Sequence, residues 1–353
     1  PVLNSSESDY EFDFRDLVKD DCRSSVSGKI RCLIDHENKR IRLLDASNGS
    51  IKGENVKFAN LISFRGESYT ITSIAPNAFK NVTTLTGTIE FPSSLKSVGD
   101  YAFSGCNKIT GSIILPTTVT YIGDYAFDGC NQITGLTIPS SVKYIGSCAF
   151  KDCSSIANRV VIPNEITEIL PSTFQGCSKL TEVTFSNKLT KIGQNAFNNC
   201  VKLANILLPD SLVEIDDYAF NSCTSLTKVD ISNHVTRIGS YSFQSCTGLT
   251  DVNVADSVEL IDKYAFYGCS NLTNVNINEE TSNLTKIGDY AFANASKLKI
   301  INFPRKLESI GERAFLSDSA FVGTPKIPES VTEIGFYAFY GTGCNTKTTW
   351  GFN

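Results

Sequence analysis

Cysteine is the residue type whose number and spacing could carry chemistry in this chain. Eight of the 12 cysteines lie three residues after a regularly spaced phenylalanine. Thiols at one position of successive turns would face the same way about one strand spacing (~4.8 Å) apart, which suits disulfide geometry poorly. Because cysteine also packs as a small buried hydrophobe, we predict a structural column of thiols, with metal or redox chemistry as the alternative. The column comprises Cys106, Cys130, Cys153, Cys177, Cys200, Cys223, Cys246 and Cys269.

The remaining residues suited to chemistry are few and scattered. Cys22 and Cys32 flank a predicted hairpin and are the candidate disulfide. His36 and His234 are far apart in the layout, so no nucleophile–histidine–carboxylate arrangement is expected, and closely spaced Cys/His pairs suited to zinc are absent outside the column. We therefore expect no enzyme activity, no catalytic residue, no cofactor and no metal site. Carboxylates in equivalent loops leave calcium as an alternative to simple solvated turns at Asp210, Asp256, Glu279, Glu280 and Glu329.

A repeat positions these residues. Its clearest copies, Val98–Cys106 and Ile122–Cys130, have the form Ile/Val-Gly-Asp-Tyr-Ala-Phe-x-Gly-Cys. The step between repeat phenylalanines is 23 or 24 residues, except for one step of 26 from Phe266 to Phe292. A fixed period of this size indicates a solenoid. The repeat phenylalanines are Phe79, Phe103, Phe127, Phe150, Phe174, Phe197, Phe220, Phe243, Phe266, Phe292, Phe315 and Phe339.

Each repeat predicts two short strands and one short helical turn, as residues 180–200 illustrate. LTEVTF is the first strand, with Val183 inward and Thr184 outward. LTKIG is the second strand, Gly193 supplies a turn, and QNAFNNC is the helical turn, which an Asp before Tyr-Ala-Phe would cap in other copies. The predicted fold is a β-rich α/β solenoid, a right-handed superhelix of about 11–12 units of the size of leucine-rich repeats.

The sequence divides into four predicted parts. Residues 1–25 are polar and acidic and are expected to be flexible. Residues 26–72 contain two predicted β-hairpins and would cap the solenoid. Residues 73–345 hold the repeats, and residues 346–353 form the C-terminal end, where Trp350 would cover the last turn. Because the chain starts at Pro1 and has no methionine, we expect it to be part of a longer protein.

Composition argues against two kinds of interaction, nucleic-acid binding and membrane insertion. The net charge of −5 argues against nucleic acid, because no basic stripe is present to neutralise phosphates. No run of about 18 apolar residues exists, so we expect no membrane insertion within this chain.

The outward position of the first strand forms one exposed column, which is the candidate ligand-binding surface. Its apolar members, Ile114, Val161 and Leu207, would be binding anchors or ordinary strand residues. Its asparagines would contact backbone or glycans, or form an amide ladder that stabilises the sheet. The column comprises Glu90, Ile114, Thr137, Val161, Thr184, Leu207, Asp230, Asn253, Asn276, Asn302 and Lys326.

The repeat LxxVxIPxSVxxIGxxAFxxCxxL resembles the BspA-type, or Treponema-pallidum-type, leucine-rich repeat over roughly residues 70–345. FRGESYTITSIAPNAF is similar to the segment that precedes such repeats, and ITGSIILP at Ile109–Pro116 is similar to copies in trichomonad surface proteins. Members of this family are surface or secreted proteins of bacteria and mucosal protists. The resemblance therefore implies an extracellular adhesin for host cells, matrix proteins or other microbes, and it carries no catalytic motif.

The expected partners are host or microbial surface proteins, matrix proteins or glycans. Two other functions stay open at this stage. One is a structural coat protein that self-associates, and the other is an intracellular scaffold for protein interactions, which many free thiols would suit.

Overall fold

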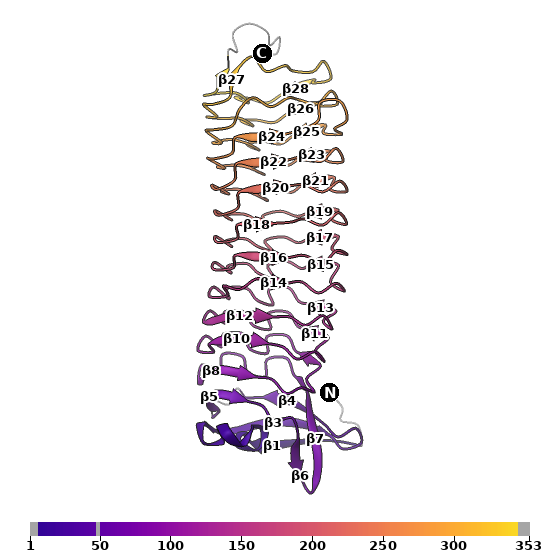
Figure 1. The fold of residues 1–353 in the computed structure, drawn as a ribbon, viewed down its shortest axis with the longest axis vertical. Coiled ribbons are helices and arrows are strands. Elements are labelled where there is room, and N and C mark those ends of the chain that lie inside the picture. The colour runs from indigo at the N-terminus through magenta and orange to yellow at the C-terminus, as the bar shows by residue number, and fades with distance from the viewer. Residues whose placement is uncertain (1–5, 47–49, 345–353) are drawn as a thin grey trace. The chain divides into compact units, whose positions relative to one another are not determined.

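The computed structural model describes residues 6–46 and 50–344. The chain divides into two compact units: unit 1 is Pro1–Ile166 with Thr173–Leu180, and unit 2 is Thr167–Ser172 with Thr181–Asn353. In each unit the chain coils through a short first strand, a turn, a short second strand and a run of tight turns (Figure 1). Among the described residues, no helix combines the length and the apolar character that a membrane crossing requires.

Antiparallel strands cap unit 1 and then give way to parallel ones. β3 pairs antiparallel with β1 and β4, and β6 with β7, so both predicted hairpins are present. β4 then pairs parallel with β7, and β7 parallel with β9, the first of the repeat's second strands. The elements are β1 (Glu7–Asp13), η1 (Phe14–Leu17), η2 (Asp20–Ser25), β2 (Val26–Ser27), β3 (Lys29–Asp35), β4 (Arg40–Asp45), β5 (Lys52–Lys57), β6 (Ile62–Phe64) and β7 (Glu67–Ile74).

The expectation of a flexible segment over residues 1–25 is wrong for the part that the structure describes. β1 pairs with β3 from Glu7↔Asp35 to Asp13↔Lys29. Phe12, Phe14 and Leu17 are buried, so three apolar side chains within a polar segment attach it to the core. Residues 346–353 and Trp350 lie outside the described residues.

The repeats form two rows of parallel strands. In unit 2 the second strands pair in the order β15-β17-β19-β21-β23-β25-β26-β28, with each buried Ile opposite the next, as in Ile215↔Ile238. The first strands are β8 (Leu85–Glu90), β10 (Gly111–Ile114), β12 (Ile133–Thr137), β14 (Val160–Val161), β16 (Glu182–Thr184), β18 (Asn205–Ile206), β20 (Lys228–Asp230), β22 (Asp251–Asn253), β24 (Asn274–Asn276) and β27 (Val322–Gly323). The second strands are β9 (Ser97–Val98), β11 (Tyr121–Ile122), β13 (Tyr144–Ile145), β15 (Glu168–Ile169), β17 (Lys191–Ile192), β19 (Glu214–Ile215), β21 (Arg237–Ile238), β23 (Leu260–Ile261), β25 (Lys286–Ile287), β26 (Ser309–Ile310) and β28 (Glu333–Ile334), while β29 (Gly343–Cys344) pairs with β27.

The predicted helical turns are absent, so the α/β description is wrong: among the described residues, helix occurs only as the 3-10 segments η1 and η2. The backbone explains the difference in the coil around Phe220. Tyr218 and Ser222 have φ angles of 58° and 60°, which an α-helix cannot contain. The N–H groups of Tyr218 and Phe220 donate to the following coil, to Ser240 O at 2.9 Å and Ser242 O at 2.8 Å. This segment is therefore a run of tight turns that adds a third ladder between coils.

A glycine precedes most runs of tight turns and approaches the preceding coil closely, whereas residues such as Leu170, Asp216 and Asp262 hold the equivalent position in other coils. The sequence suggests that Gly193 serves as a flexible turn residue, but a Cβ atom there would lie 2.7 Å from Ile169 O in the preceding coil. At Gly239 the corresponding contact with the Asp216 carbonyl carbon is 2.6 Å. Contacts this short mean that the backbone of these two coils would have to shift to admit a side chain at Gly193 or Gly239.

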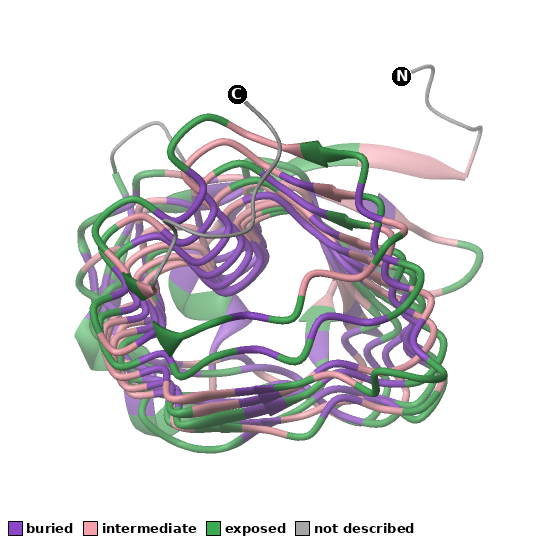
Figure 2. Ribbon diagram, turned by 90° about the horizontal axis from the view of Figure 1, so that it is seen from above, coloured by how far each residue is buried: buried purple, intermediate pink, exposed green. Residues whose placement is uncertain are grey.

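A stack of phenylalanine rings forms the centre of each unit. In unit 1 the centroids of Phe79 and Phe103 are 5.0 Å apart, and in unit 2 those of Phe243 and Phe266 are 5.3 Å apart with the rings within 4° of parallel. Offset stacking of this kind is favourable beyond the apolar area that it buries. Buried positions consequently recur at the same place in successive coils (Figure 2).

The stack predicts a large difference between two phenylalanines of unit 2. Phe243→Ala would remove a fully buried ring between two stacked neighbours and should cost about 3–5 kcal/mol of unfolding free energy. Phe336→Ala, at a side chain that is 71% exposed, should cost far less. Urea unfolding followed by circular dichroism measures both, and equal losses would contradict the assignment of the core.

Candidate functional site

Most members of the predicted ligand-binding column lie on the first strands, whereas Leu207, Asn302 and Lys326 lie outside any strand. Every member is exposed except Thr184 and Asn253, which are partly exposed. Its most exposed apolar members are Ile114 at 62% and Leu207 at 82%. In unit 1 the structure places Glu90, Ile114, Thr137 and Val161 at or near the ends of β8, β10, β12 and β14, and unit 2 carries Thr184, Leu207, Asp230, Asn253, Asn276, Asn302 and Lys326.

A hollow of about 590 Å³ opens beside this column in unit 1. It lies where the row of first strands is interrupted, because β8 belongs to the sheet β2-β5-β8 and β10 to the sheet β10-β12. Its lining combines Phe91, Ile114 and Pro116 with Lys57 and Glu90. Apolar walls with a few charged groups at the rim are typical of a binding site.

The asparagines of the column form the amide ladder that the sequence left as one alternative. Asn276 Nδ2 donates to Asn253 Oδ1 at 2.6 Å, and Asn253 Nδ2 donates to Asp230 Oδ1. On the same strands Asn274 Nδ2 donates to Asp251 Oδ1 at 2.7 Å. These two runs of side-chain hydrogen bonds end at a second hollow, of about 400 Å³, which Asn274, Asn276 and Asn302 help to line.

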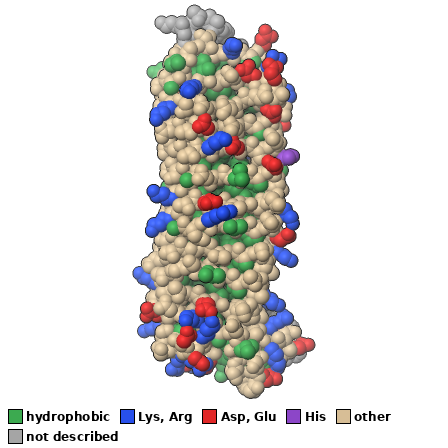
Figure 3. All heavy atoms as spheres, in the orientation of Figure 1, with side chains coloured by type: hydrophobic (Ala, Val, Ile, Leu, Met, Phe, Trp, Pro, Cys, Tyr) green, Lys and Arg blue, Asp and Glu red, His purple; other side chains and the backbone are tan. Residues whose placement is uncertain are grey.

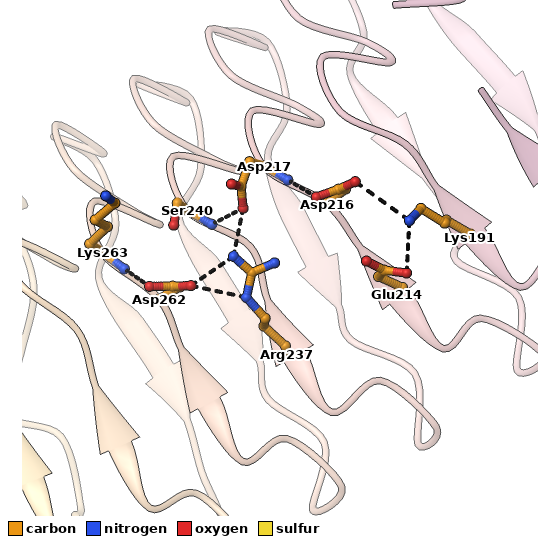
Figure 4. Close-up of polar contacts among 8 residues, drawn as sticks. All are labelled: Lys191, Glu214, Asp216, Asp217, Arg237, Ser240, Asp262 and Lys263. Carbon is orange, nitrogen blue, oxygen red and sulfur yellow. Dashed lines mark hydrogen bonds and ion pairs between the residues drawn. The ribbon is translucent and has the colours of Figure 1, made fainter. Parts of the chain in front are cut away.

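The second strands of unit 2 carry a network of alternating charges (Figure 4). Lys191 Nζ lies 3.0 Å from Glu214 Oε2 and 3.6 Å from Asp216 Oδ2. Arg237 Nη2 lies 2.7 Å from both Asp217 Oδ1 and Asp262 Oδ2 and so joins three coils. Register explains the network, because Lys191, Glu214 and Arg237 are directly paired positions.

Electrostatics indicate a structural role for this network. Burial disfavours the charged form of Asp262, but hydrogen bonds from the Lys263 backbone N–H and from Arg237 outweigh it and lower the pKa of the carboxyl. The Asp262 carboxyl is therefore ionised at neutral pH and is paired with Arg237. Among the described residues, no group of three or more His, Cys, Asp and Glu side chains has the arrangement of a metal site, and Figure 3 shows acidic and basic side chains interspersed on the face that it draws.

The eight cysteines of the column are buried, and none of them forms a disulfide. In unit 2 Cys246 Sγ donates to Phe220 O of the preceding coil at 3.2 Å, and in unit 1 Cys130 Sγ donates to Phe103 O at 3.2 Å. Burial raises the pKa of the Cys246 thiol to about 12, so the reactive thiolate is not populated near neutral pH. Each such thiol thus serves as a small core residue and as a weak hydrogen-bond donor between coils.

The candidate disulfide between Cys22 and Cys32 is wrong, because both are free thiols. Cys22, on η2, directs Sγ to Lys19 O at 3.3 Å. Cys32, on β3, directs Sγ to Ile30 O at 3.9 Å and is fully buried. The residues between them form the end of η2, β2 and the start of β3 rather than a hairpin, and the two thiols are directed to different carbonyls.

Asp318 occupies the cysteine position of its coil and is fully buried. Its Oδ1 accepts the Ala295 backbone N–H at 2.8 Å, whereas Oδ2 has no hydrogen-bond partner among the described residues. Burial raises the pKa of this carboxyl to about 9, although the Ala295 N–H opposes the shift. The carboxyl is therefore protonated in the folded protein at neutral pH.

The sequence did not indicate the actual role of the conserved-looking Asp of the repeat, which was expected to cap its own helical turn. Asp100 Oδ1 instead accepts the backbone N–H of Asp124 at 2.9 Å, and Asp217 Oδ1 accepts that of Ser240 at 2.8 Å. Both acceptors bond to the following coil. Only the coiled arrangement brings that N–H within reach.

His36 lies in a chain of hydrogen bonds that the sequence did not reveal. Its Nε2 lies 2.8 Å from Ser8 Oγ and its Nδ1 lies 2.9 Å from Tyr69 Oη, which donates to Glu67 Oε2 at 2.9 Å. A serine beside a histidine can act in nucleophilic catalysis when an oriented acid and an oxyanion site complete it. None of the hollows described in this protein is lined by these residues. This chain of hydrogen bonds joins β1, the β3–β4 turn and β7.

At the other histidine, His234 Nδ1 lies 2.7 Å from Asp210 O.

The charge network predicts a loss of stability when its centre is removed. Arg237→Ala should lower the unfolding free energy at pH 7 by on the order of 1 kcal/mol, because the arginine is about one third exposed and solvent screens its ion pairs. The pKa of Asp262 is lowered in the folded state, so its contribution is present at neutral pH and disappears as the pH falls below about 4. Urea titrations at pH 7 and pH 3 should therefore show a smaller effect in acid. Lys202→Ala, at an exposed lysine, is the control.

We expect the buried Asp318 carboxyl to make the stability of the protein depend on pH in the opposite direction. Its folded pKa lies above the ordinary value of 3.8, so its stabilising contribution is complete below pH 4 and is lost as the pH rises toward 9. Asp318→Asn keeps an acceptor for the Ala295 N–H and should stabilise the protein at pH 8. The slope of the unfolding free energy against pH should change by up to about 1.4 kcal/mol per pH unit, because the variant has no carboxyl to ionise at this position. The melting temperature from pH 4 to pH 8 tests this. The same change at exposed Asp210 should have no effect, and identical slopes for Asp318→Asn and wild type would contradict the prediction.

Comparisons with known proteins agree with this architecture. The family described as BspA type leucine rich repeat region matches in six copies, over residues 54–158, 110–227, 157–273 and 213–347. The solved structure of a leucine-rich repeat protein from Bacteroides ovatus is 25% identical, with 88% of this chain and 90% of that chain covered and a TM-score of 0.64. A leucine rich cell surface protein from Faecalibacterium prausnitzii is 20% identical, with coverages of 90% and 94% and a TM-score of 0.51, and this likeness concerns the fold alone. A search of curated proteins finds no significant match. The matched residues make up most of the chain, which therefore belongs to the BspA-type leucine-rich repeat family.

Proposed function

We propose that this protein is displayed outside a cell and attaches to other proteins through the exposed column of its first strands. The observation that carries the proposal is the hollow beside β8 and β10, with Ile114 exposed at its edge. An exposed isoleucine beside buried Phe91 offers an apolar anchor, and Lys57 and Glu90 supply a polar rim. Interfaces commonly combine a desolvated apolar anchor with such a rim.

Membership of the family and the cell-surface description of the Faecalibacterium protein support an extracellular location. The expected partners are surface proteins of host cells or microbes, matrix proteins and glycans. Attachment would use many modest contacts on a repetitive surface, since repeat proteins typically bind along an extended face.

An intracellular scaffold is the second candidate, and the presence of 12 cysteines without a disulfide favours it. Burial weakens that argument. Cys153 and Cys223 are fully buried, and burial raises the pKa of both thiols well above the ordinary value. Thiols in this state resist oxidation in either compartment, so the free cysteines are compatible with a location outside the cell.

Binding to a panel of matrix proteins, mucins and epithelial cells tests the proposal. Wild-type protein should bind at least one of them saturably, and Ile114→Ser should weaken that binding tenfold or more because it removes the apolar anchor. Val213→Ser, at an exposed apolar residue outside the column, is the matched control and should bind normally.

Failure of the wild type to bind any partner would reject attachment. Light scattering across concentration then distinguishes the remaining functions, because a coat protein should assemble as its concentration rises.

A further inference from the structure

The ladder of first strands in unit 2 stops at β24. β24 is the last strand of the sheet β20-β22-β24, and the residues one repeat later, 300–303, form no strand. The Lys299 N–H still donates to Thr273 O at 3.1 Å, and the Arg305 N–H donates to Glu279 O at 3.0 Å. Within the described part of the chain, no backbone hydrogen bond joins residues 274–278 to residues 300–304. The coils therefore separate over this stretch, next to the 26-residue step in the repeat.

The separation exposes backbone groups of β24. In a parallel ladder, alternate residues direct both N–H and C=O to the same neighbouring strand. Asn274 and Asn276 bond to the preceding coil, as the bonds Asn274 N–H to Thr250 O and Val254 N–H to Asn276 O show. Val275 and Ile277 consequently direct their backbone groups toward the following coil, into the hollow of about 400 Å³ that they line.

The amide ladder presents acceptors to the same hollow. A carboxylate only accepts hydrogen bonds, so Asp230 and Asp251 set the orientation of the amides that bond to them. Asn276 and Asn274 therefore donate hydrogen bonds from Nδ2 to side chains of the preceding coil. Their Oδ1 atoms stay available to a ligand that donates hydrogen bonds.

Donors complete the lining. Asn278 Oδ1 accepts the backbone N–H of Glu280 at 3.0 Å, which leaves its Nδ2 as a donor. Asn302 has no hydrogen bond among the described residues and can donate and accept. Lys299 is the one charged side chain of the lining. Its charge helps to lower the pKa of Asp251, but no direct ion pair joins it to a carboxylate among the described residues. The hollow thus combines several donors and acceptors with one positive charge that has no direct ion-pair partner.

We propose that this hollow binds a carbohydrate that carries a carboxylate, such as a uronic acid residue. Sugar hydroxyls both donate and accept, which matches a lining of amides and unpaired backbone groups. The carboxylate would pair with Lys299, and the apolar ring face would lie against Ile300, which is 36% exposed. A volume of about 400 Å³ is within the range of small-molecule sites. Asn276 and Asn302 belong to the exposed column of the proposed function, but the site lies in unit 2 and does not include Ile114.

The test is titration of the full chain with methyl glucuronide, methyl glucoside and acetate, followed by saturation-transfer NMR and calorimetry. Methyl glucuronide should bind saturably and at least fivefold more tightly than methyl glucoside. The double variant Asn276→Ala/Asn302→Ala should weaken binding of both sugars tenfold or more. Lys299→Gln should remove the preference for the glucuronide and retain binding of the glucoside.

Matched controls lie outside the hollow. Asn205→Ala, at an exposed asparagine of β18, and Lys202→Gln should bind as the wild type does. Thermal unfolding of every variant confirms that it is folded.

Three outcomes would overturn the proposal: no saturable binding of either sugar, undiminished binding by the Asn276→Ala/Asn302→Ala variant, or acetate binding as tight as that of the glucuronide. These outcomes are distinct from failure of protein attachment. Ile114→Ser should leave sugar binding unchanged, and a wild type that captures a matrix protein but no sugar rejects this inference alone.

Discussion

Hydrogen bonds between successive coils are the constraint on which each unit depends. Backbone groups of the two strands and of the tight turns bond to adjacent coils. The Tyr218 N–H donates to Ser240 O of the following coil, and the Gly239 N–H donates to Ile215 O of the preceding coil. Coils joined at one strand spacing bring equivalent side chains into direct contact. Each repeat position must therefore hold a side chain that packs against the equivalent side chains of the neighbouring coils. This requirement explains the phenylalanine stack and the thiol column. It also explains glycines such as Gly193, where the neighbouring coil leaves no room for a Cβ atom.

The same constraint separates structural from functional positions. Interior columns repeat with little change, because an altered member must still pack against two neighbours. Asp318 shows the cost of a change: it places a carboxyl at a buried cysteine position, and burial raises its pKa to about 9. The exposed column varies from Ile114 to Asn276. Both hollows beside it lie where the row of first strands is interrupted, after β8 and after β24. A regular ladder leaves no unpaired backbone groups, so its interruptions are where a ligand can find them.

Charged residues follow the ladder as well. Lys191, Glu214 and Arg237 occupy paired positions of β17, β19 and β21 and neutralise one another and nearby aspartates. Such networks limit repulsion along a stack in which like charges would otherwise face each other.

The sequence alone determined the period, the two strands of each repeat, the two hairpins of the cap and the identity of the buried columns, because these follow from local patterns of apolar residues. The eleven exposed positions of the column followed from the alternation of side chains along a strand. Tertiary structure decided the rest. Left-handed residues such as Tyr218 replaced the predicted helical turn, Asp217 bonded to the next coil, and Cys22 and Cys32 remained unpaired. The hollows arise where adjacent coils part, which depends on contacts between residues more than 20 positions apart. The sequence marks the hollow of unit 2 only by the 26-residue step beside it.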